Sequence, residues 1–426
     1  MPTNPQVTSP APRERSPGNT RRVRAAPTLC SVFATFAVGG PQLRFATIAN
    51  RLGPRYRHLI VAMDGNTEAR ERLAPNLDLS VPAIDTAKRA TLANRARYRA
   101  ALRAWRPDLL ITSNWGSIEW AMADLPRLVP HIHIEDGFGP EEQSRQLRRR
   151  VLTRRLVLCR SLVIVPSRTL YRLATERWRL DPARVRIIPN GIDLAAIAAA
   201  TPAVLPISTG AIANEIVIGT VAALRPEKAL DRLLRAVAAL APSPPIRLVI
   251  VGDGPERPRL EALAAALGIA ARVHFAGHSP APAGYYRRFD LFALSSDTEQ
   301  MPLSVIEAMA AGLPVAATDV GDLREMLAPE NAPCVAARDP AALAAALARL
   351  IADPAGRAAI GAANRARAMA EFDQERMIAA YGALFDAATG AAPEGAPGGA
   401  PGGAIGTATG AATGAATDGT GPARQA

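Results

Sequence analysis

Two glutamates eight positions apart stand out in the segment "TEQMPLSVIEAMAAGLPV", residues 298–315. Glu299 comes just before a predicted helix, and Glu307 lies about one turn inside it. Pro302, between them, suits the first turn of a helix, where a missing N–H costs little. Glu307 could accept two hydroxyl hydrogen bonds of the kind that a ribose diol offers, and Glu299 would reach toward the group beyond. The alternative is a solvated helix face, where most glutamates lie.

The start of this helix is itself a candidate anion site. The backbone N–H groups of Leu303, Ser304 and Val305 would point out of the first turn without partners. Together with the helix dipole they suit a diphosphate.

Two cations, Arg225 and Lys228, follow the first predicted strand of the second half of the chain. Cations at a helix N-terminus oppose the dipole, so a nearby anion would explain them. They could neutralise a departing diphosphate without a metal. The alternative is an ordinary basic helix start.

Glycine turns follow two further predicted strands. Gly252 and Gly254, in "VGDGPE", could cradle a base or a sugar, while Gly39 and Gly40 could let a ligand approach the backbone closely. Both signals are weak, because most such glycines only make turns.

The elements that must position these residues alternate strand and helix in two blocks, separated by a loose Ala/Pro/Ser stretch at about 195–214. Of the 426 residues, 49% are hydrophobic and only 4% are aromatic, which favours helices packed on parallel sheets. We therefore predict two doubly wound α/β domains. Ligands of such sheets bind at the carboxyl ends of the strands, where the loops described above lie.

The composition limits the partners and the compartment. A formal net charge of +12 admits nucleotides, anionic lipid or nucleic acid. Nucleic acid is disfavoured because no recognisable binding module is present. The three cysteines (Cys30, Cys159 and Cys334) are far apart, which indicates a reducing compartment. No apolar run of about 18 residues predicts a membrane span, and the N-terminus lacks the apolar core of a secretory signal.

Five segments together resemble one enzyme family: "IIPNGID", "IGTVAALRPEK", "RLVIVGDGPER", "VHFAGH" and "FDLFALSSDTEQMPLSVIEAMAAGLPVAATDVGD". They are similar to the retaining glycosyltransferases of family 4, the group 1 type, over about residues 28–388 and most densely over 185–327. The resemblance implies a GT-B fold, in which two Rossmann-like domains face each other. It also implies that the C-terminal domain binds the nucleotide-sugar and the N-terminal domain binds the acceptor.

The E-x7-E motif of that family matches Glu299 and Glu307. By position, the resemblance implies that Glu307 holds the nucleoside ribose, that Glu299 contacts sugar hydroxyls and that Lys228 contacts the diphosphate. It implies further contacts to the diphosphate and sugar from the backbone of Met301, Pro302, Leu303 and Ser304.

The sequence departs from the family pattern at two positions. The family often has arginine five residues before the lysine, where this chain has Ala223, and Arg225 is offset by two residues. It often has glycine after the first glutamate, where this chain has Gln300. These departures leave open whether Arg225 substitutes for the missing arginine and which sugar is bound.

The segment "HIHIEDGFGPEE" lies where relatives often place a histidine near the reacting sugar. His133 is the nearest candidate, but Glu135 and Asp136 lie closer to the predicted strand end, where a carboxylate could accept the proton of the acceptor hydroxyl. We take Asp136 as the candidate base, with His133, Glu135 and Gly137 on the acceptor side beside Gly39 and Gly40. The alternative is a capped turn with Asp136–Gly137 as its turn signal, and the residue that assists the hydroxyl stays open.

The expected organisation has six parts: a disordered basic tail (1–27), an acceptor-side Rossmann-like domain (28–194), a linker (195–214), a nucleotide-sugar-binding domain (215–370), a helix that by resemblance crosses back to the first domain (371–388), and a disordered low-complexity tail (389–426). Both tails lack the apolar residues that a packed core requires.

We predict a retaining glycosyltransferase that moves a sugar from a UDP- or GDP-sugar to a saccharide or lipid-linked acceptor, in cell-surface polysaccharide or glycolipid synthesis. No cofactor beyond the nucleotide-sugar co-substrate and no metal are expected, since the chain has no Asp-x-Asp pair. The alternatives are a GT-B-fold epimerase and a non-enzymatic nucleic-acid- or glycan-binding protein. The expected location is the cytoplasm, with peripheral attachment to the inner face of the membrane as an open alternative.

That alternative depends on "RQLRRRVLTRRLVLCR", residues 145–160, which carries seven arginines and no acid. It is either a domain helix with a solvated basic face or a helix whose basic face, including Arg148, Arg149 and Arg154, rests on anionic lipid.

Overall fold

The computed structural model describes residues 26–87, 90–138, 142, 146–205 and 215–391. The described residues through Ala391 belong to one compact unit. Residues 1–25 and 392–426, which make up nearly all of the two predicted tails, lie outside the described residues. So do residues 206–214 of the predicted linker.

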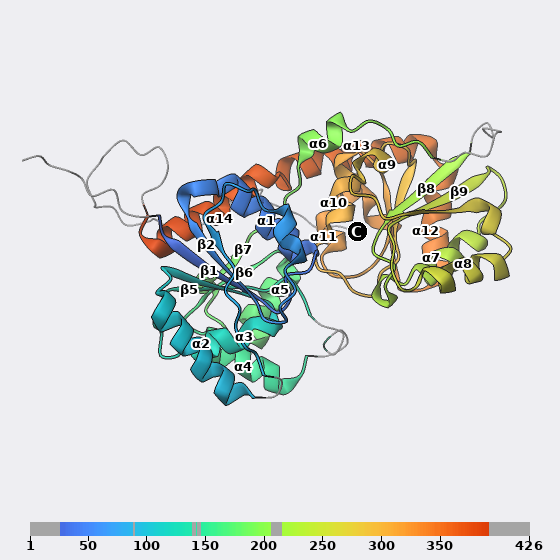
Figure 1. Cartoon of the computed structure of the whole chain (residues 1–426). Helices are drawn as coiled ribbons and strands as arrows, with labels where there is room; N and C mark the ends of the chain where they lie inside the picture. The colour runs from blue at the N-terminus through green and yellow to red at the C-terminus, as the bar shows by residue number, and fades with distance from the viewer. Residues whose placement is uncertain (1–25, 88–89, 139–141, 143–145, 206–214, 392–426) are drawn as a thin grey trace, which may run out of the picture. The chain divides into compact units, whose positions relative to one another are not determined.

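The first half of the chain forms a seven-stranded, all-parallel sheet with the order β3-β2-β1-β4-β5-β6-β7 (Figure 1). Its strands are β1 (Thr28–Phe33), β2 (Arg57–Ala62), β3 (Leu79–Ser80), β4 (Leu109–Ser113), β5 (His131–Ile134), β6 (Leu162–Val165) and β7 (Val185–Ile187). Its helices are α1 (Gly40–Leu52), α2 (Thr91–Trp105), α3 (Ile118–Ala123), α4 (Arg148–Leu158) and α5 (Arg168–Arg172). Parallel neighbours need crossover connections, and helices supply most of them here.

The second half forms a six-stranded, all-parallel sheet with the order β10-β9-β8-β11-β12-β13. Its strands are β8 (Ile216–Val221), β9 (Ile246–Val251), β10 (Val273–Gly277), β11 (Leu291–Leu294), β12 (Val315–Thr318) and β13 (Val335–Ala336). Its helices are α7 (Leu230–Ala238), α8 (Arg257–Ala266), α9 (Ala283–Tyr286), α10 (Leu303–Ala310), α11 (Leu323–Met326) and α12 (Pro340–Ala352).

Shorter and connecting elements complete the described chain. The 3-10 helices are η1 (Gly53–Arg55), η2 (Glu68–Arg72), η3 (Trp115–Ser117), η6 (Pro182–Arg184), η7 (Pro226–Lys228), η8 (Ala270–Arg272) and η9 (Pro329–Cys334). A single π-helical turn, η5 (Leu173–Arg177), continues α5. The remaining helices are α6 (Leu194–Ala199), α13 (Pro354–Glu371) and α14 (Gln374–Thr389).

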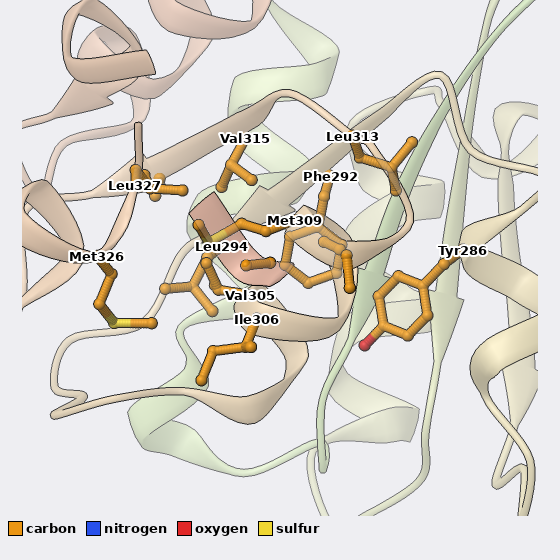
Figure 2. Close-up of a cluster of buried hydrophobic side chains, with 14 of the residues drawn as sticks. Tyr286, Phe292, Leu294, Val305, Ile306, Met309, Leu313, Val315, Met326 and Leu327 are labelled. Atoms are coloured by element: carbon orange, nitrogen blue, oxygen red, sulfur yellow. The ribbon is translucent and has the colours of Figure 1, made fainter. Parts of the chain in front are cut away.

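Apolar packing determines how α10 lies beside the second sheet. Val305, Ile306 and Met309 of α10 are buried against Phe292 of β11 and Val315 of β12 in one cluster (Figure 2). Since residues three and four apart share a helix face, burial of this face holds the helix in one orientation. The start of α10 is thereby held at the carboxyl ends of the strands.

The last helix, α14, packs on the first sheet. Met377, Ile378, Tyr381 and Phe385 of α14 lie in the same core cluster as Leu29 of β1. Asp386 near its end accepts hydrogen bonds from both Arg55 and Tyr56. These contacts tie the C-terminal end of the described chain to the first domain.

The predicted fold class, two Rossmann-like α/β domains, is confirmed. Two details differ from the prediction. The stretch expected to be a loose linker begins with α6, whose N-terminus is capped by the Asp193 carboxylate accepting from the Ala196 N–H at 2.8 Å. The two-residue edge strands β3 and β13 were not predicted, because so short a strand leaves no periodic signal.

Candidate active site

A cavity of about 270 Å³ brings together residues from four of the predicted loops. Glu299 and Gln300 line it from the end of β11, Lys228 lines it from η7, and Asp136 follows β5. The start of α10 closes one side, through Met301, Pro302, Leu303 and Ser304. Gly40, Pro41, Arg44 and Asn190 complete the lining.

Glu299 and Lys228, predicted from separate loops, form an ion pair inside this cavity. Lys228 Nζ donates to Glu299 Oε1 at 2.6 Å, and Ser296 Oγ donates to the same oxygen at 2.8 Å. The Lys228 loop is held from behind by Ser295, whose hydroxyl donates to the Lys228 carbonyl at 3.0 Å. Within the described part of the chain, Glu299 Oε2 makes no hydrogen bond, so it is available to a ligand.

The start of α10 offers two free amides rather than the three predicted. The helix begins at Leu303, and Pro302 is its N-cap rather than part of its first turn. The Val305 N–H is consumed inside the helix, where it donates to the Pro302 carbonyl at 3.1 Å. A tightened first turn of this kind satisfies amides that would otherwise lack partners. The amides of Leu303 and Ser304 make no such bond with the described residues.

Glu307 is oriented by a residue that the sequence analysis missed. The Tyr286 hydroxyl, at the end of α9, donates to Glu307 Oε2 at 2.6 Å. Burial raises the pKa of Glu307, and the hydrogen bond from Tyr286 opposes that rise. Burial and the neighbouring carboxylate raise the pKa of Tyr286 well above its usual range, so the hydroxyl stays protonated and donates. Glu307 Oε1 has no partner among the described residues, and the side chain lines an adjoining cavity of about 360 Å³.

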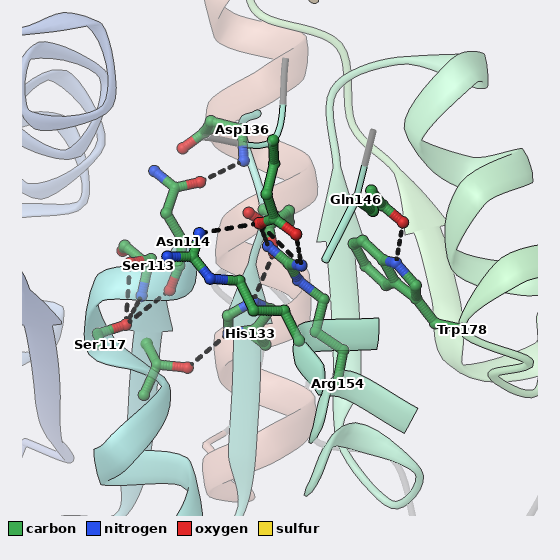
Figure 3. Close-up of polar contacts among 12 residues, drawn as sticks. Ser113, Asn114, Ser117, His133, Asp136, Gln146, Arg154 and Trp178 are labelled. Carbon is green, nitrogen blue, oxygen red and sulfur yellow. Dashed lines mark hydrogen bonds and ion pairs between the residues drawn. The ribbon is translucent and has the colours of Figure 1, made fainter. Parts of the chain in front are cut away.

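Asp136 is held by a second missed residue, Arg44 of α1. Arg44 donates to both carboxylate oxygens, with Nη2 at 2.8 Å from Oδ2. Burial alone would lower the pKa of Arg44, but the charge of Asp136 raises it above its usual range. The Asp136 N–H donates to Asn114 Oδ1 at 2.7 Å (Figure 3), which holds the loop in place. The Arg44 guanidinium therefore engages both carboxylate oxygens of Asp136.

Asn190, in the segment "PNGID", links Arg44 to the α10 segment. Its Oδ1 accepts from Arg44 Nη1 at 2.9 Å, and its Nδ2 donates to the Met301 carbonyl at 3.0 Å. The sequence analysis quoted this segment only as part of the family resemblance and gave Asn190 no role.

His133 and Glu135 do not line these cavities. Both side chains are fully buried, with His133 Nδ1 2.7 Å from Thr112 Oγ1 and Glu135 Oε2 3.1 Å from Arg154 Nε (Figure 3). They belong to a polar network inside the first domain, so of the three candidates in this loop only Asp136 reaches the candidate site.

Burial of Arg154 corrects the predicted membrane-facing set. Arg154 is 0% exposed and bonds to Glu135 and Glu142, with its guanidinium packed against Trp178. A buried charge needs such partners, so α4 turns this residue inward rather than toward solvent. Arg148 and Arg149 are exposed as predicted.

Three further predicted residues, Gly252, Gly254 and Arg225, do not line these cavities. A Cβ on Gly252 would lie 1.9 Å from the Ala222 carbonyl oxygen, and one on Gly254 would lie 2.5 Å from that of Leu224. Packing of two neighbouring strand-end loops therefore explains both glycines. Arg225 is exposed at the N-cap of η7.

Two acceptor-side glycines lie at the edges of the site. Gly39 is the N-cap of α1, where a Cβ would meet the Gln42 side chain at 2.9 Å. A Cβ on Gly137 would lie 3.2 Å from the Gln300 side chain. Gly39 thus begins the helix that carries Arg44, and Gly137 packs beside a residue that lines the cavity.

The described residues contain neither a cluster suited to a metal ion nor a helix suited to spanning a membrane. No group of three or more histidine, cysteine, aspartate or glutamate side chains there is placed to hold a metal ion. No helix there is both long enough and apolar enough to cross a membrane.

Relatives of known class match both halves of the chain. A model of the group 1 glycosyl transferases matches residues 206–367, and a model of glycosyltransferase family 4 matches residues 38–196. The D-inositol 3-phosphate glycosyltransferase of Nocardia farcinica is 31% identical over 240 residues, which cover 51% of this chain and 52% of that protein. The protein of the same name from Stackebrandtia nassauensis is 30% identical over 303 residues, covering 65% and 68%. The chain thus spans about half the length of the first of these relatives.

The fold matches solved structures over nearly the whole described chain. The crystal structure of Anabaena HepE in complex with UDP has a TM-score of 0.68 at 20% identity, covering 85% of this chain and 100% of that one. At this identity the similarity concerns the fold alone. Together with the sequence matches, it shows that the chain belongs to the group 1 glycosyltransferases of family 4, with the GT-B fold.

Proposed function

We propose that the chain is a retaining, metal-independent glycosyltransferase that uses a nucleoside diphosphate-sugar as donor. The observation that carries the proposal is the pairing of Lys228 with Glu299 beside the free amides of Leu303 and Ser304. A cation and two backbone donors around one cavity suit a diphosphate whose negative charge grows as it leaves. A UDP-sugar is the first candidate, because HepE was crystallised with UDP-glucose, and a GDP-sugar is the alternative.

In this proposal each side chain has one task. Glu307, oriented by Tyr286, accepts the ribose hydroxyls through Oε1. Lys228 and the α10 amides hold the diphosphate, and Glu299 Oε2 accepts a hydroxyl of the donor sugar. The acceptor hydroxyl attacks from the face that the diphosphate leaves, and its proton passes to the leaving phosphate. Arg44, held by Asp136 and Asn190, adds a positive charge on the first-domain side of the same cavity.

We propose a saccharide, a lipid-linked saccharide or a phosphorylated polyol as the acceptor. The first two follow from the family resemblance, in cell-surface polysaccharide or glycolipid synthesis. The third is suggested by the two relatives named for D-inositol 3-phosphate. The proposed location is the cytoplasm.

Peripheral attachment to anionic lipid is proposed for the exposed face of α4. Its two exposed leucines, Leu152 at 55% and Leu156 at 61%, share one face of the helix with the exposed arginines Arg148, Arg149 and Arg155. Leucines can enter the headgroup region while the flanking arginines bind lipid phosphates, at about 1 kcal/mol each. With Arg154 buried, Arg155 takes its place in the lipid-facing set.

The test is donor turnover by the full chain with a panel of UDP- and GDP-sugars, with and without EDTA, measuring nucleotide release and the anomeric configuration of the product. Lys228→Gln should lower kcat by roughly 100-fold, because one charge-stabilising donor is lost. Arg225→Gln is the matched control: it removes a cation of the same loop that lies outside the cavity, and it should have little effect. Inverted product, or inactivation by EDTA that Mn²⁺ reverses, would refute the proposed mechanism.

A further inference from the structure

The helix α5 does not end regularly but continues into a π-helical turn, Leu173–Arg177. The Trp178 N–H donates to the Leu173 carbonyl at 3.0 Å, five residues back, and the Leu180 N–H donates to the Ala174 carbonyl at 3.0 Å. Such single π-turns occur often at functional sites.

Arg177 and Arg179, at the end of the π-turn, both face solvent because Trp178 between them is buried. Trp178 is fully buried, and its Nε1 donates to Gln146 at 3.1 Å (Figure 3). Arg177 and Arg179 flank it, and both are exposed. Arg179 has φ of +54°, a region that non-glycine residues rarely adopt and that is enriched at ligand sites.

These arginines line a cavity of about 590 Å³ formed within the first domain. Thr169, Arg172 and Leu173 also line it, and Glu176 contributes its one carboxylate. Arg172 Nη2 lies 3.8 Å from Glu325 Oε1, whereas the side chains of Arg177 and Arg179 have no ion pair or hydrogen bond among the described residues. The cavity therefore has more positive than negative charge, even after Glu176 is counted.

Arg177 also lines a second cavity, of about 420 Å³, that contains Glu299. The four carboxylates of that cavity are already paired, in the ion pairs Glu142–Arg154, Asp297–Arg232, Glu299–Lys228 and Asp319–Arg324. None of them is paired with Arg177. An anion brought by a substrate is the partner that Arg177 lacks.

We infer that this 590 Å³ cavity beside the π-turn, called the groove below, is an acceptor subsite that binds a phosphate group through Arg177 and Arg179. Guanidinium groups bind phosphate oxygens with paired, charge-assisted hydrogen bonds. An acceptor phosphate held there would leave the acceptor hydroxyl free to enter the Glu299 cavity. This inference rests on the proposed function and narrows its acceptor to a phosphate-bearing molecule.

The test titrates glycerol 3-phosphate, and glycerol as its neutral counterpart, into the full chain saturated with UDP. Saturation occupies Lys228 and the α10 amides, so that added phosphate reports on a separate site. Wild type should bind glycerol 3-phosphate saturably and glycerol not at all. Arg177→Gln/Arg179→Gln should weaken that binding by about tenfold or more and leave UDP affinity unchanged.

The control is Arg103→Gln/Arg235→Gln, which removes the same charge from exposed positions of α2 and α7. The groove variant is Arg177→Gln/Arg179→Gln. The inference is overturned if the control loses as much affinity for glycerol 3-phosphate as the groove variant, or if the groove variant binds glycerol 3-phosphate like wild type. It is also overturned if the groove variant loses only binding to anionic vesicles, since the groove would then be a lipid surface. Failure of the wild-type chain to bind both UDP and GDP would instead refute the proposed function, and the phosphate titration can still be read without nucleotide.

Discussion

Glu307→Ala separates the binding role of this carboxylate from its structural role. In the proposed mechanism the ribose binds Glu307 Oε1, while the Tyr286 hydroxyl donates to Oε2 at 2.6 Å. A hydrogen bond to a charged group contributes roughly 1.5–3 kcal/mol, so losing one should weaken nucleotide binding by roughly 10- to 150-fold. The 2′,3′-dideoxy nucleotide, which lacks both hydroxyls, should bind wild type and variant equally. Isothermal titration calorimetry with both nucleotides measures the difference.

The same substitution leaves the fully buried Tyr286 hydroxyl without its partner. An unpaired buried hydroxyl costs roughly 1–3 kcal/mol of unfolding free energy. Adding Tyr286→Phe removes that hydroxyl, so the double variant should recover stability in urea unfolding without recovering nucleotide affinity. The reasoning is refuted if Glu307→Ala binds the ribonucleotide like wild type, or if it loses equal affinity for the dideoxy nucleotide.

Three further predictions concern turnover, acid stability and lipid binding. Glu299→Gln should lower kcat by roughly 100-fold while nucleotide affinity by calorimetry stays nearly unchanged, because Glu299 is assigned to the sugar. His58 is 3% exposed, and burial lowers its pKa to about 4. The unfolded chain, with an ordinary pKa near 6.5, therefore binds the extra proton first as pH falls. The contribution of His58 to the free energy of unfolding is therefore fully present above about pH 6.5 and falls by about 3 kcal/mol as the pH is lowered toward 4. His58→Leu should flatten this pH dependence in urea unfolding. Changing Arg148, Arg149 and Arg155 to Gln should abolish sedimentation with anionic vesicles at low salt.

Each of these predictions has an outcome that contradicts it. Glu299→Gln that turns over like wild type would remove Glu299 from the proposed mechanism. An unchanged acid slope in His58→Leu, with the exposed His278→Leu as control, would assign the slope to other groups. Equal sedimentation of wild type with neutral vesicles would show that α4 does not act through its charge.

The sequence by itself determined the fold class and pointed to the residues that we propose for the donor side. Buried apolar strands alternating with amphipathic helices leave few architectures other than doubly wound parallel sheets. Strand ends in such sheets meet at one edge, so the loops carrying Glu299 and Lys228 could be placed in one site before any coordinates were known. The spacing of Glu299 and Glu307 is local, and a local pattern can be read from neighbouring residues.

Only the tertiary structure decided which partners these residues have. Tyr286 reaches Glu307 from 21 residues away, and Arg44 reaches Asp136 from 92 residues away. The sheet order and the helix packing determine which distant residues come into contact, and local periodicity in the sequence does not contain that information. The burial of Arg154 shows the same limit, because helical spacing alone assigns an arginine to the polar face. Two carboxylates and three aromatic rings from other elements contact the Arg154 guanidinium and stabilise its charge in the interior.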